Sequence, residues 1–268
     1  MAVVGIPILI FSKYIIFALL MSFLTVFALF EMYRAIGIEK KLVITAPTYV
    51  MGFAFPLVSY FLAEAHTFGI LLLFAAALFI YLMYVFTVAV FNKGAIRFEE
   101  ISVAFVISCY VIYSFSSISI MRYMHSEAGL FYIILMLVCA WGSDVFAYFT
   151  GRFFGKHKLI PEVSPKKTVE GAIGGIVCAG GLAMLYGLIV SSLTELTPNY
   201  LVLALCGVIL AAFSQIGDLI ASLLKREHGI KDYGRIFPGH GGVMDRFDSI
   251  LAIATVLMAI CLVFPPFA

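Results

Sequence analysis

The side chains best suited to chemistry lie in a 27-residue segment near the C-terminus, Ser222 to Asp248. This segment contains nine of the chain's 32 Lys, Arg, Asp and Glu residues, and it lies between two long apolar runs. A charged, glycine-rich loop between membrane spans is energetically costly, so the segment is a candidate functional site.

Three carboxylates in and beside this segment have the spacing of a shared site. Helical periodicity places Asp218, inside the preceding apolar run, on one face with Ser222 and Lys225. Asp245 and Asp248 are three residues apart and share one face at the start of the last helix. Such carboxylates favour Mg²⁺ that holds the phosphates of a nucleotide. The alternative for Asp245 and Asp248 is that they only stabilise a helix dipole.

A glycine-rich run, Pro238 to Gly242, connects these elements. Its glycines permit backbone conformations with positive φ and the close approach of a ligand. The N–H groups of Gly241 and Gly242 could therefore cradle a phosphate. His240 is a candidate general base, or a residue that orients the backbone or the ligand.

A second polar segment begins with Asp144 inside a span and continues into a basic loop. Ser164 is predicted to cap a helix whose first residue is Pro165. Lys166 and Lys167 would then lie at a helix N-terminus, which is an anion site suited to a triphosphate. The alternative is a loop that is basic only because membrane topology requires it.

Several other site classes lack their motifs. The sequence has no GxxxxGK[ST] run, which excludes an ordinary P-loop NTPase, and no GxSxG elbow of a serine hydrolase. The five cysteines stand singly inside apolar runs, which indicates buried hydrophobic residues rather than disulfides or metal–thiolate sites. The net charge of +2 gives no indication of nucleic acid binding.

The elements that must position these residues are membrane spans. The chain is 63% hydrophobic and 12% charged, whereas soluble domains carry about 25% charged residues. The composition predicts an all-α, polytopic integral membrane bundle of about eight to nine transmembrane helices. The predicted spans cover residues 15–34, 43–63, 69–91, 101–120, 129–149, 169–191, 200–224 and 246–264.

The opening stretch, Ala2 to Ser12, is apolar but short of a full span. Half of a helical hairpin, a re-entrant segment and the remnant of a longer N-terminus all remain open. A cleaved signal peptide is disfavoured because no charged region precedes the stretch.

Positive charge predicts the orientation. Fifteen of the 17 basic residues fall on alternate connections between spans, which places the loops 150–168 and 225–245 on the cytoplasmic side. All five aspartates follow residue 140. Residues 1–128 are therefore predicted to be a transmembrane scaffold and residues 129–268 a transmembrane catalytic region.

The segment Ser222 to Asp248 resembles the phosphatidate cytidylyltransferase family, the CDP-diacylglycerol synthases. The family pattern is S-x-x-K-R, four residues, K-D, and further on a small residue, P-x-H-G-G and D-R-x-D, and the segment contains these groups in this order. Asp144–Arg152 and Ser164–Gly171 are similar to the family's second block, which extends the resemblance over roughly residues 140–264.

The resemblance implies that CTP and phosphatidic acid react to give CDP-diacylglycerol and pyrophosphate. It implies Mg²⁺, with K⁺ as an assisting cation, at an inner membrane with the site facing the cytoplasm. The lipid bilayer is the third partner, no nucleic acid is involved, and a homodimer is left open. Asp218 and Asp245 are implied as metal ligands.

The expected site residues follow from the resemblance and the charge pattern together. Residues expected to take part in catalysis are Asp218, Asp245, Asp248, Lys225, Arg226 and His240. Residues expected to bind the substrate or the nucleotide are Asp144, Ser164, Lys166, Lys167, Lys231, Gly241, Gly242 and Arg246.

Two rival functions remain, a lipid kinase and a transporter. A CTP-dependent lipid kinase of the dolichol or phytol kinase type shares the membrane setting, but the unbroken H-G-G and D-R-x-D pattern favours the cytidylyltransferase. CDP-alcohol phosphotransferases need a DxxDG…D…D motif that the sequence lacks. A transporter could use Asp144 and Asp218 for coupling ions, but the reactive residues cluster in loops on one predicted side and no inverted repeat is evident.

Overall fold

The computed structural model describes residues 11–92, 96–124, 127–237, 239 and 241–267. Most of the opening stretch, Pro238 and His240 lie outside the described residues, and so do the predictions made for them. Eight helices in the described part are long and apolar enough to cross a membrane, which confirms the all-α fold class. The protein is a multi-pass membrane protein.

The membrane-spanning helices follow the apolar runs of the sequence closely, and two short strands lie in the basic loop. In chain order they are the 3₁₀ helix η1 (Phe11–Lys13), α2 (Ile15–Ala35), α3 (Leu42–Phe91), α4 (Phe98–Met124), α5 (Gly129–Phe154), β1 (Lys158–Ile160), β2 (Ser164–Thr168), α6 (Val169–Leu193), α7 (Tyr200–Glu227) and α8 (Met244–Val263).

The chain forms two compact units. Unit 1 comprises residues 1–126 and 232–245, and unit 2 comprises residues 127–231 and 246–268. Helix α8 therefore begins with two residues of unit 1 and continues in unit 2.

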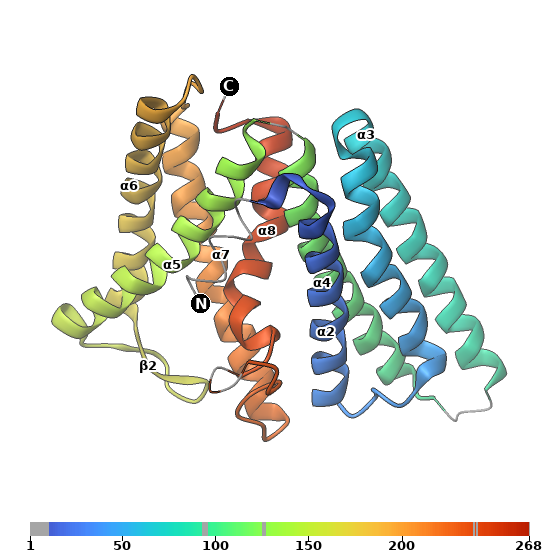
Figure 1. Ribbon diagram of the computed structural model, residues 1–268. Coiled ribbons are helices and arrows are strands. Elements are labelled where there is room, and N and C mark those ends of the chain that lie inside the picture. The colour runs from blue at the N-terminus through green and yellow to red at the C-terminus, as the bar shows by residue number, and fades with distance from the viewer. Residues whose placement is uncertain (1–10, 93–95, 125–126, 238, 240, 268) are drawn as a thin grey trace. The chain divides into compact units, whose positions relative to one another are not determined.

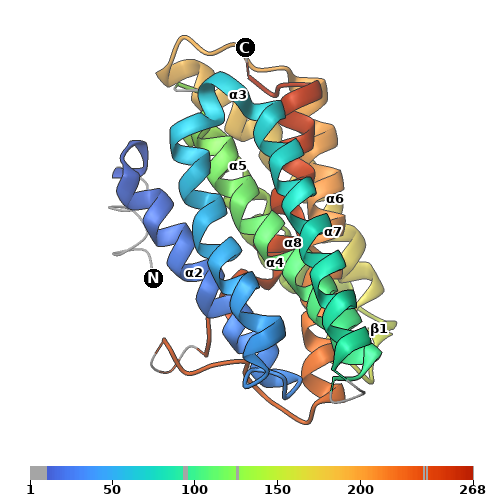
Figure 2. The ribbon, with the colours of Figure 1, turned by 90° about the vertical axis from the view of Figure 1, so that its right-hand side faces the viewer.

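Unit 1 contains α2, α3 and α4, which pack against one another (Figures 1 and 2). Helix α3 bends at His66, whose φ of −142° and ψ of 40° are not helical, and its two limbs are the spans Leu42–Leu62 and His66–Phe91. Tyr33 on α2 joins the three helices, because its hydroxyl donates to Thr48 Oγ1 at 2.9 Å and lies 2.7 Å from Ser108 Oγ.

Unit 2 is built on α5, α6 and α7, with α5 and α7 both in contact with α6. Between α5 and α6 the chain forms a small antiparallel hairpin, in which Lys158 pairs with Thr168 and Ile160 with Ser164 (Figure 1).

The hairpin corrects the prediction that Ser164 caps a helix. Ser164 and Pro165 are extended because they belong to strand β2. Helix α6 begins four residues later, where the hydroxyl of Thr168 accepts from Gly171 N at 3.1 Å and satisfies one of the free N–H groups of the first turn. Lys166 and Lys167 therefore lie in a strand and not in the first turn of a helix.

Candidate active site

Asp218 is the central acidic residue of unit 2. It lies inside the span of α7, and its Oδ2 is 2.5 Å from the Nζ of Lys167 on strand β2. The two side chains are 31% and 27% exposed, respectively. The ion pair joins the basic loop to the last residues of the apolar run that precedes the C-terminal acidic segment.

Two further carboxylates interact with Asp218. Asp144 on α5 interacts electrostatically with Asp218 and with Lys167. Asp248 on α8 interacts with Asp218 and with Lys225. Three carboxyl groups and two lysines are thus close enough to interact electrostatically, and carboxylates that repel one another attract a further cation.

Close helix packing beside Asp218 brings these residues together. The amide of Gln215 donates to Ser143 Oγ and to the Ala172 carbonyl, both at 3.1 Å, and so ties α7 to α5 and α6. A Cβ atom on Gly217 would lie 2.9 Å from the main-chain oxygen of Asp248. Only glycine therefore allows α7 to approach α8 this closely next to Asp218.

Glu170 anchors the hairpin that carries Lys167. Its carboxylate accepts from the main-chain N–H of Lys156 at 3.1 Å and of His157 at 3.2 Å, and it lies 2.7 Å from His157 Nδ1. The loop that enters β1 is thereby fixed to the first turn of α6. Sequence analysis did not identify Glu170, although a glutamate two residues after a capping threonine is a helix-start signal.

In unit 1 the main chain holds the predicted metal ligand Asp245. Its Oδ2 accepts from Tyr233 N at 2.8 Å and from Gly242 N at 3.0 Å. Gly241 has a φ of +83°, and a Cβ there would lie 2.9 Å from Asp245 Oδ2. The N–H of Gly242 therefore donates to a protein carboxylate, and the predicted phosphate cradle at these glycines stays a prediction.

A residue that sequence analysis missed completes this cluster. The carboxylate of Glu31 on α2 is buried and accepts from Val243 N at 3.0 Å and Met244 N at 2.8 Å. The signal that could have identified it is its position inside a predicted span, where a carboxylate requires partners.

The structure thus divides the predicted site residues between the two units. Asp144, Lys167, Asp218, Lys225 and Asp248 gather in unit 2, and Gly241, Gly242 and Asp245 gather in unit 1. Those with exposed side chains are Lys166, Arg226, Lys231 and Arg246, while Ser164 is half-buried in β2. Their individual roles stay predictions.

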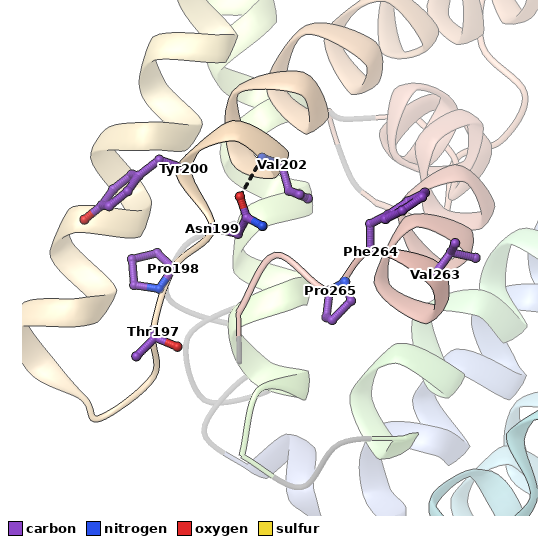
Figure 3. A pocket seen from close by; sticks show the side chains of 8 residues that line it. All are labelled: Thr197, Pro198, Asn199, Tyr200, Val202, Val263, Phe264 and Pro265. Carbon is purple, nitrogen blue, oxygen red and sulfur yellow. Dashed lines mark hydrogen bonds between the residues drawn. The ribbon is translucent and has the colours of Figure 1, made fainter.

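A pocket of about 600 Å³ lies in unit 2, away from the carboxylates (Figure 3). It is formed where α7 begins and α8 ends, and Asn199 Oδ1 there accepts from Val202 N at 3.2 Å. Asn199 precedes Asp218 by 19 residues, which is about 28 Å along a helix. This pocket is therefore separate from the acidic cluster.

Comparison with known proteins agrees with the chemistry of these residues. The model of the cytidylyltransferase family matches residues 1–264, which is nearly the whole chain. The chain belongs to the cytidylyltransferase family. The predicted relationship is thereby confirmed.

Curated relatives in this family carry a more specific name. The phosphatidate cytidylyltransferase of Bacillus subtilis is 41% identical over 171 residues, which cover 64% of this chain and 62% of that protein. Those of Staphylococcus epidermidis and Staphylococcus aureus are each 40% identical, over 162 and 164 residues, and the match covers 60% of this chain and 60% of each relative. The matched part thus spans about three fifths of the length of these relatives.

Proposed function

We propose that this protein is a phosphatidate cytidylyltransferase, which transfers CMP from CTP to phosphatidic acid and releases pyrophosphate. The observation that carries the proposal is the ion pair of Lys167 with Asp218 inside a membrane span, with Asp144 and Asp248 around it. The names of the similar proteins support the same reaction. The charged side chains of this site lie at a membrane-spanning helix, where the phosphate of a membrane lipid would meet a nucleotide.

The reaction itself needs little proton chemistry. An oxygen of the lipid phosphate attacks the α-phosphorus of CTP and forms a new P–O bond, while the bond to the bridging oxygen of the β-phosphate breaks. Pyrophosphate leaves with that electron pair. The attacking phosphate is already largely dianionic at neutral pH, because the second pKa of a phosphomonoester is about 6. No general base is required, and none is assigned.

The main barrier is repulsion between two anions, and cationic side chains lower it. Lys167 is half-buried and is held by Asp218, so it can turn toward a phosphate without leaving the site. Lys225 interacts electrostatically with Asp248. Lys166 and Arg226 are exposed and would meet CTP as it arrives from solvent.

The donor set suits Mg²⁺, which prefers carboxylate oxygens and is usually held by one or two of them together with substrate phosphates. In the described ranges, no group of three or more His, Cys, Asp or Glu residues is arranged to hold a metal. We propose Asp218 and Asp245 as carboxylates that contact Mg²⁺. When bound, the ion would neutralise charge on the nucleotide phosphates. A contribution from K⁺ remains a prediction.

We further propose that the basic connections face the cytoplasm at an inner membrane, since 15 of the 17 basic residues favour one side. Single cysteines placed at Lys158 and Arg235, in a variant without the native cysteines, should react with an impermeant thiol reagent only from the cytoplasmic side. Labelling of either position from the opposite side would contradict this orientation.

The decisive test of the reaction is to follow labelled CTP into its products. Purified protein is given phosphatidic acid, Mg²⁺ and CTP that is labelled in either the base or the γ-phosphate. Base label should enter the organic phase only when phosphatidic acid and Mg²⁺ are present, and γ-label should remain aqueous as pyrophosphate. Transfer of γ-label to a lipid alcohol, with release of CDP, would instead identify a lipid kinase. Transfer of neither label would reopen the transporter hypothesis.

A further inference from the structure

Glu31 is a carboxylate on α2 that lies within a membrane span and is only 1% exposed. A charged side chain in an apolar interior is costly unless hydrogen bonds or opposite charges compensate it. The partners of Glu31 therefore indicate why a carboxylate is placed there.

Two of those partners are main-chain N–H groups more than 200 residues away in sequence. Glu31 Oε1 accepts from Val243 N at 3.0 Å, and Oε2 accepts from Met244 N at 2.8 Å. Met244 is the first residue of α8, where N–H groups lack acceptors within the helix. Glu31 thus caps α8 from another helix, and its negative charge also suits the helix dipole.

The loop backbone closes tightly around the same carboxylate. A Cβ atom on either Gly234 or Gly242 would overlap the carboxylate of Glu31. Gly242 also donates its N–H to Asp245 Oδ2 at 3.0 Å. One glycine thus contacts Glu31 on one side and fixes the Asp245 carboxylate through its N–H.

Arg34, three residues later on α2, holds the other end of the loop. Its guanidinium donates to the carbonyl of Tyr233, whose N–H donates to Asp245 Oδ2 at 2.8 Å. The main-chain donors at Tyr233 and Gly242 are therefore each adjacent to a group that α2 holds in place.

We propose that Glu31 is a positioning residue for Asp245, with Arg34 as a second anchor on the same helix. Glu31 contacts no substrate in this scheme; it fixes the backbone of residues 232–245 so that the Asp245 carboxylate is held ready for Mg²⁺. The inference rests on the proposed function, in which Asp245 contacts that ion. It extends the functional machinery of this chain to its second helix.

The test combines hydrogen exchange with a Mg²⁺ titration of the full-length protein in detergent. In Glu31→Gln the side-chain amide keeps one acceptor oxygen but presents an N–H₂ group to a backbone donor. The peptide covering residues 232–245 should exchange faster without Mg²⁺ and lose any protection that Mg²⁺ gives the parent protein. The Mg²⁺ concentration for half-maximal activity should rise about 10-fold or more, as for loss of a group that orients a metal ligand. The KM for phosphatidic acid should stay unchanged.

Glu100→Gln is the matched control, because Glu100 is a carboxylate of the same unit that pairs with Lys41 at 2.5 Å. It should leave both the loop exchange and the Mg²⁺ requirement unchanged. If Glu31→Gln does not fold, Glu31→Asp and the exposed-site variant Arg34→Ala should show the same changes to a smaller degree.

Two results would overturn the proposal. One is a folded Glu31 variant with unchanged loop exchange or an unchanged Mg²⁺ requirement. The other is faster exchange throughout α2, α3 and α4 with lower thermal stability and an unaltered Mg²⁺ requirement, which would make Glu31 merely structural. If the parent protein transfers no CMP, the proposed function fails, and the exchange comparison still decides whether Glu31 holds the loop.

Discussion

The two units hold their carboxylates by different means. In unit 1, Glu31 and Asp245 accept hydrogen bonds from main-chain N–H groups, at distances of 2.8–3.0 Å. In unit 2, Asp218 is paired with the flexible side chain of Lys167, and both side chains are partly exposed. One arrangement depends on a folded loop, whereas the other depends on opposite charge.

This difference suggests that the two arrangements have different roles in the reaction. Main-chain donors cannot turn away without refolding the loop, so the unit 1 arrangement fixes a carboxylate in one place. A lysine side chain can change partners among nearby anions, since its ammonium is a compact charge on a flexible stem. The arrangement in unit 2 is therefore suited to receiving and releasing phosphates, and the arrangement in unit 1 to holding one ligand group still.

The largest effect should follow from Asp218→Asn. The substitution removes a proposed metal ligand and the carboxylate that pairs with Lys167, so turnover should fall by about 10²–10³-fold or more. CDP-diacylglycerol formation measured across a Mg²⁺ titration tests this, and the melting temperature shows whether the variant is folded. Glu195→Gln, at an exposed glutamate of the same unit, should be unaffected. Near-normal turnover at any Mg²⁺ concentration would show that Asp218 takes no part in the reaction. The carboxylate arrangement of unit 2 would then have no functional role to compare with that of unit 1.

A smaller loss is expected from Lys167→Met, which keeps much of the side-chain length but removes the charge. If Lys167 moves between Asp218 and a phosphate, the KM for CTP should rise by about 10- to 100-fold, as when a group that orients a ligand is lost. Lys167→Arg should raise the KM for CTP less than Lys167→Met does, because arginine keeps the positive charge. Steady-state kinetics at saturating phosphatidic acid measure both variants, with Lys156→Ala as the control for lost loop charge. An unchanged KM for CTP would mean that the basic loop serves only membrane topology.

Gly217→Ala changes the packing beside Asp218 without touching any charge. The new methyl group would meet Ala252 and the main-chain oxygen of Asp248, and such overpacking costs about 1–3 kcal/mol. Thermal unfolding should show the loss, together with a fall in turnover. Gly181→Ala is the matched control, because a Cβ there meets no atom within 4 Å. If Gly217→Ala stays as stable and as active as Gly181→Ala, close contact between α7 and α8 is not needed for the acidic cluster.

Helix positions were predictable because each depends on a continuous apolar run. Spans predicted at 200–224 and 246–264 correspond to α7 at Tyr200–Glu227 and α8 at Met244–Val263. The hairpin was not predictable in the same way, since its strands have only three and five residues and one contains a proline. The misplaced cap at Ser164 has the same origin, because local capping rules do not detect strand pairing.

The site was predictable in its residues but not in its partnerships. Asp218, Asp245 and Lys167 were identified from charge spacing and family resemblance. The pairing of Lys167 with Asp218 joins positions 51 residues apart, and the contacts of Glu31 with Val243 and Met244 join positions more than 200 apart. Such contacts are set by tertiary packing and leave no periodic pattern in the sequence.

The smallest effect should follow from Glu170→Gln, which weakens the support of Lys167 and leaves its charge in place. The parent carboxylate accepts from two main-chain N–H groups and contacts the ring of His157, which is 78% exposed. Replacement of one oxygen by an N–H₂ group should weaken these hydrogen bonds and make hydrogen exchange in residues 155–168 about fivefold faster. The KM for CTP should rise by no more than that factor. Glu162→Gln, in the exposed turn of the same hairpin, should change neither quantity. If Glu170→Gln instead impaired CTP use more than Lys167→Met, then unit 2 would also depend on a fixed scaffold and not mainly on mobile charge.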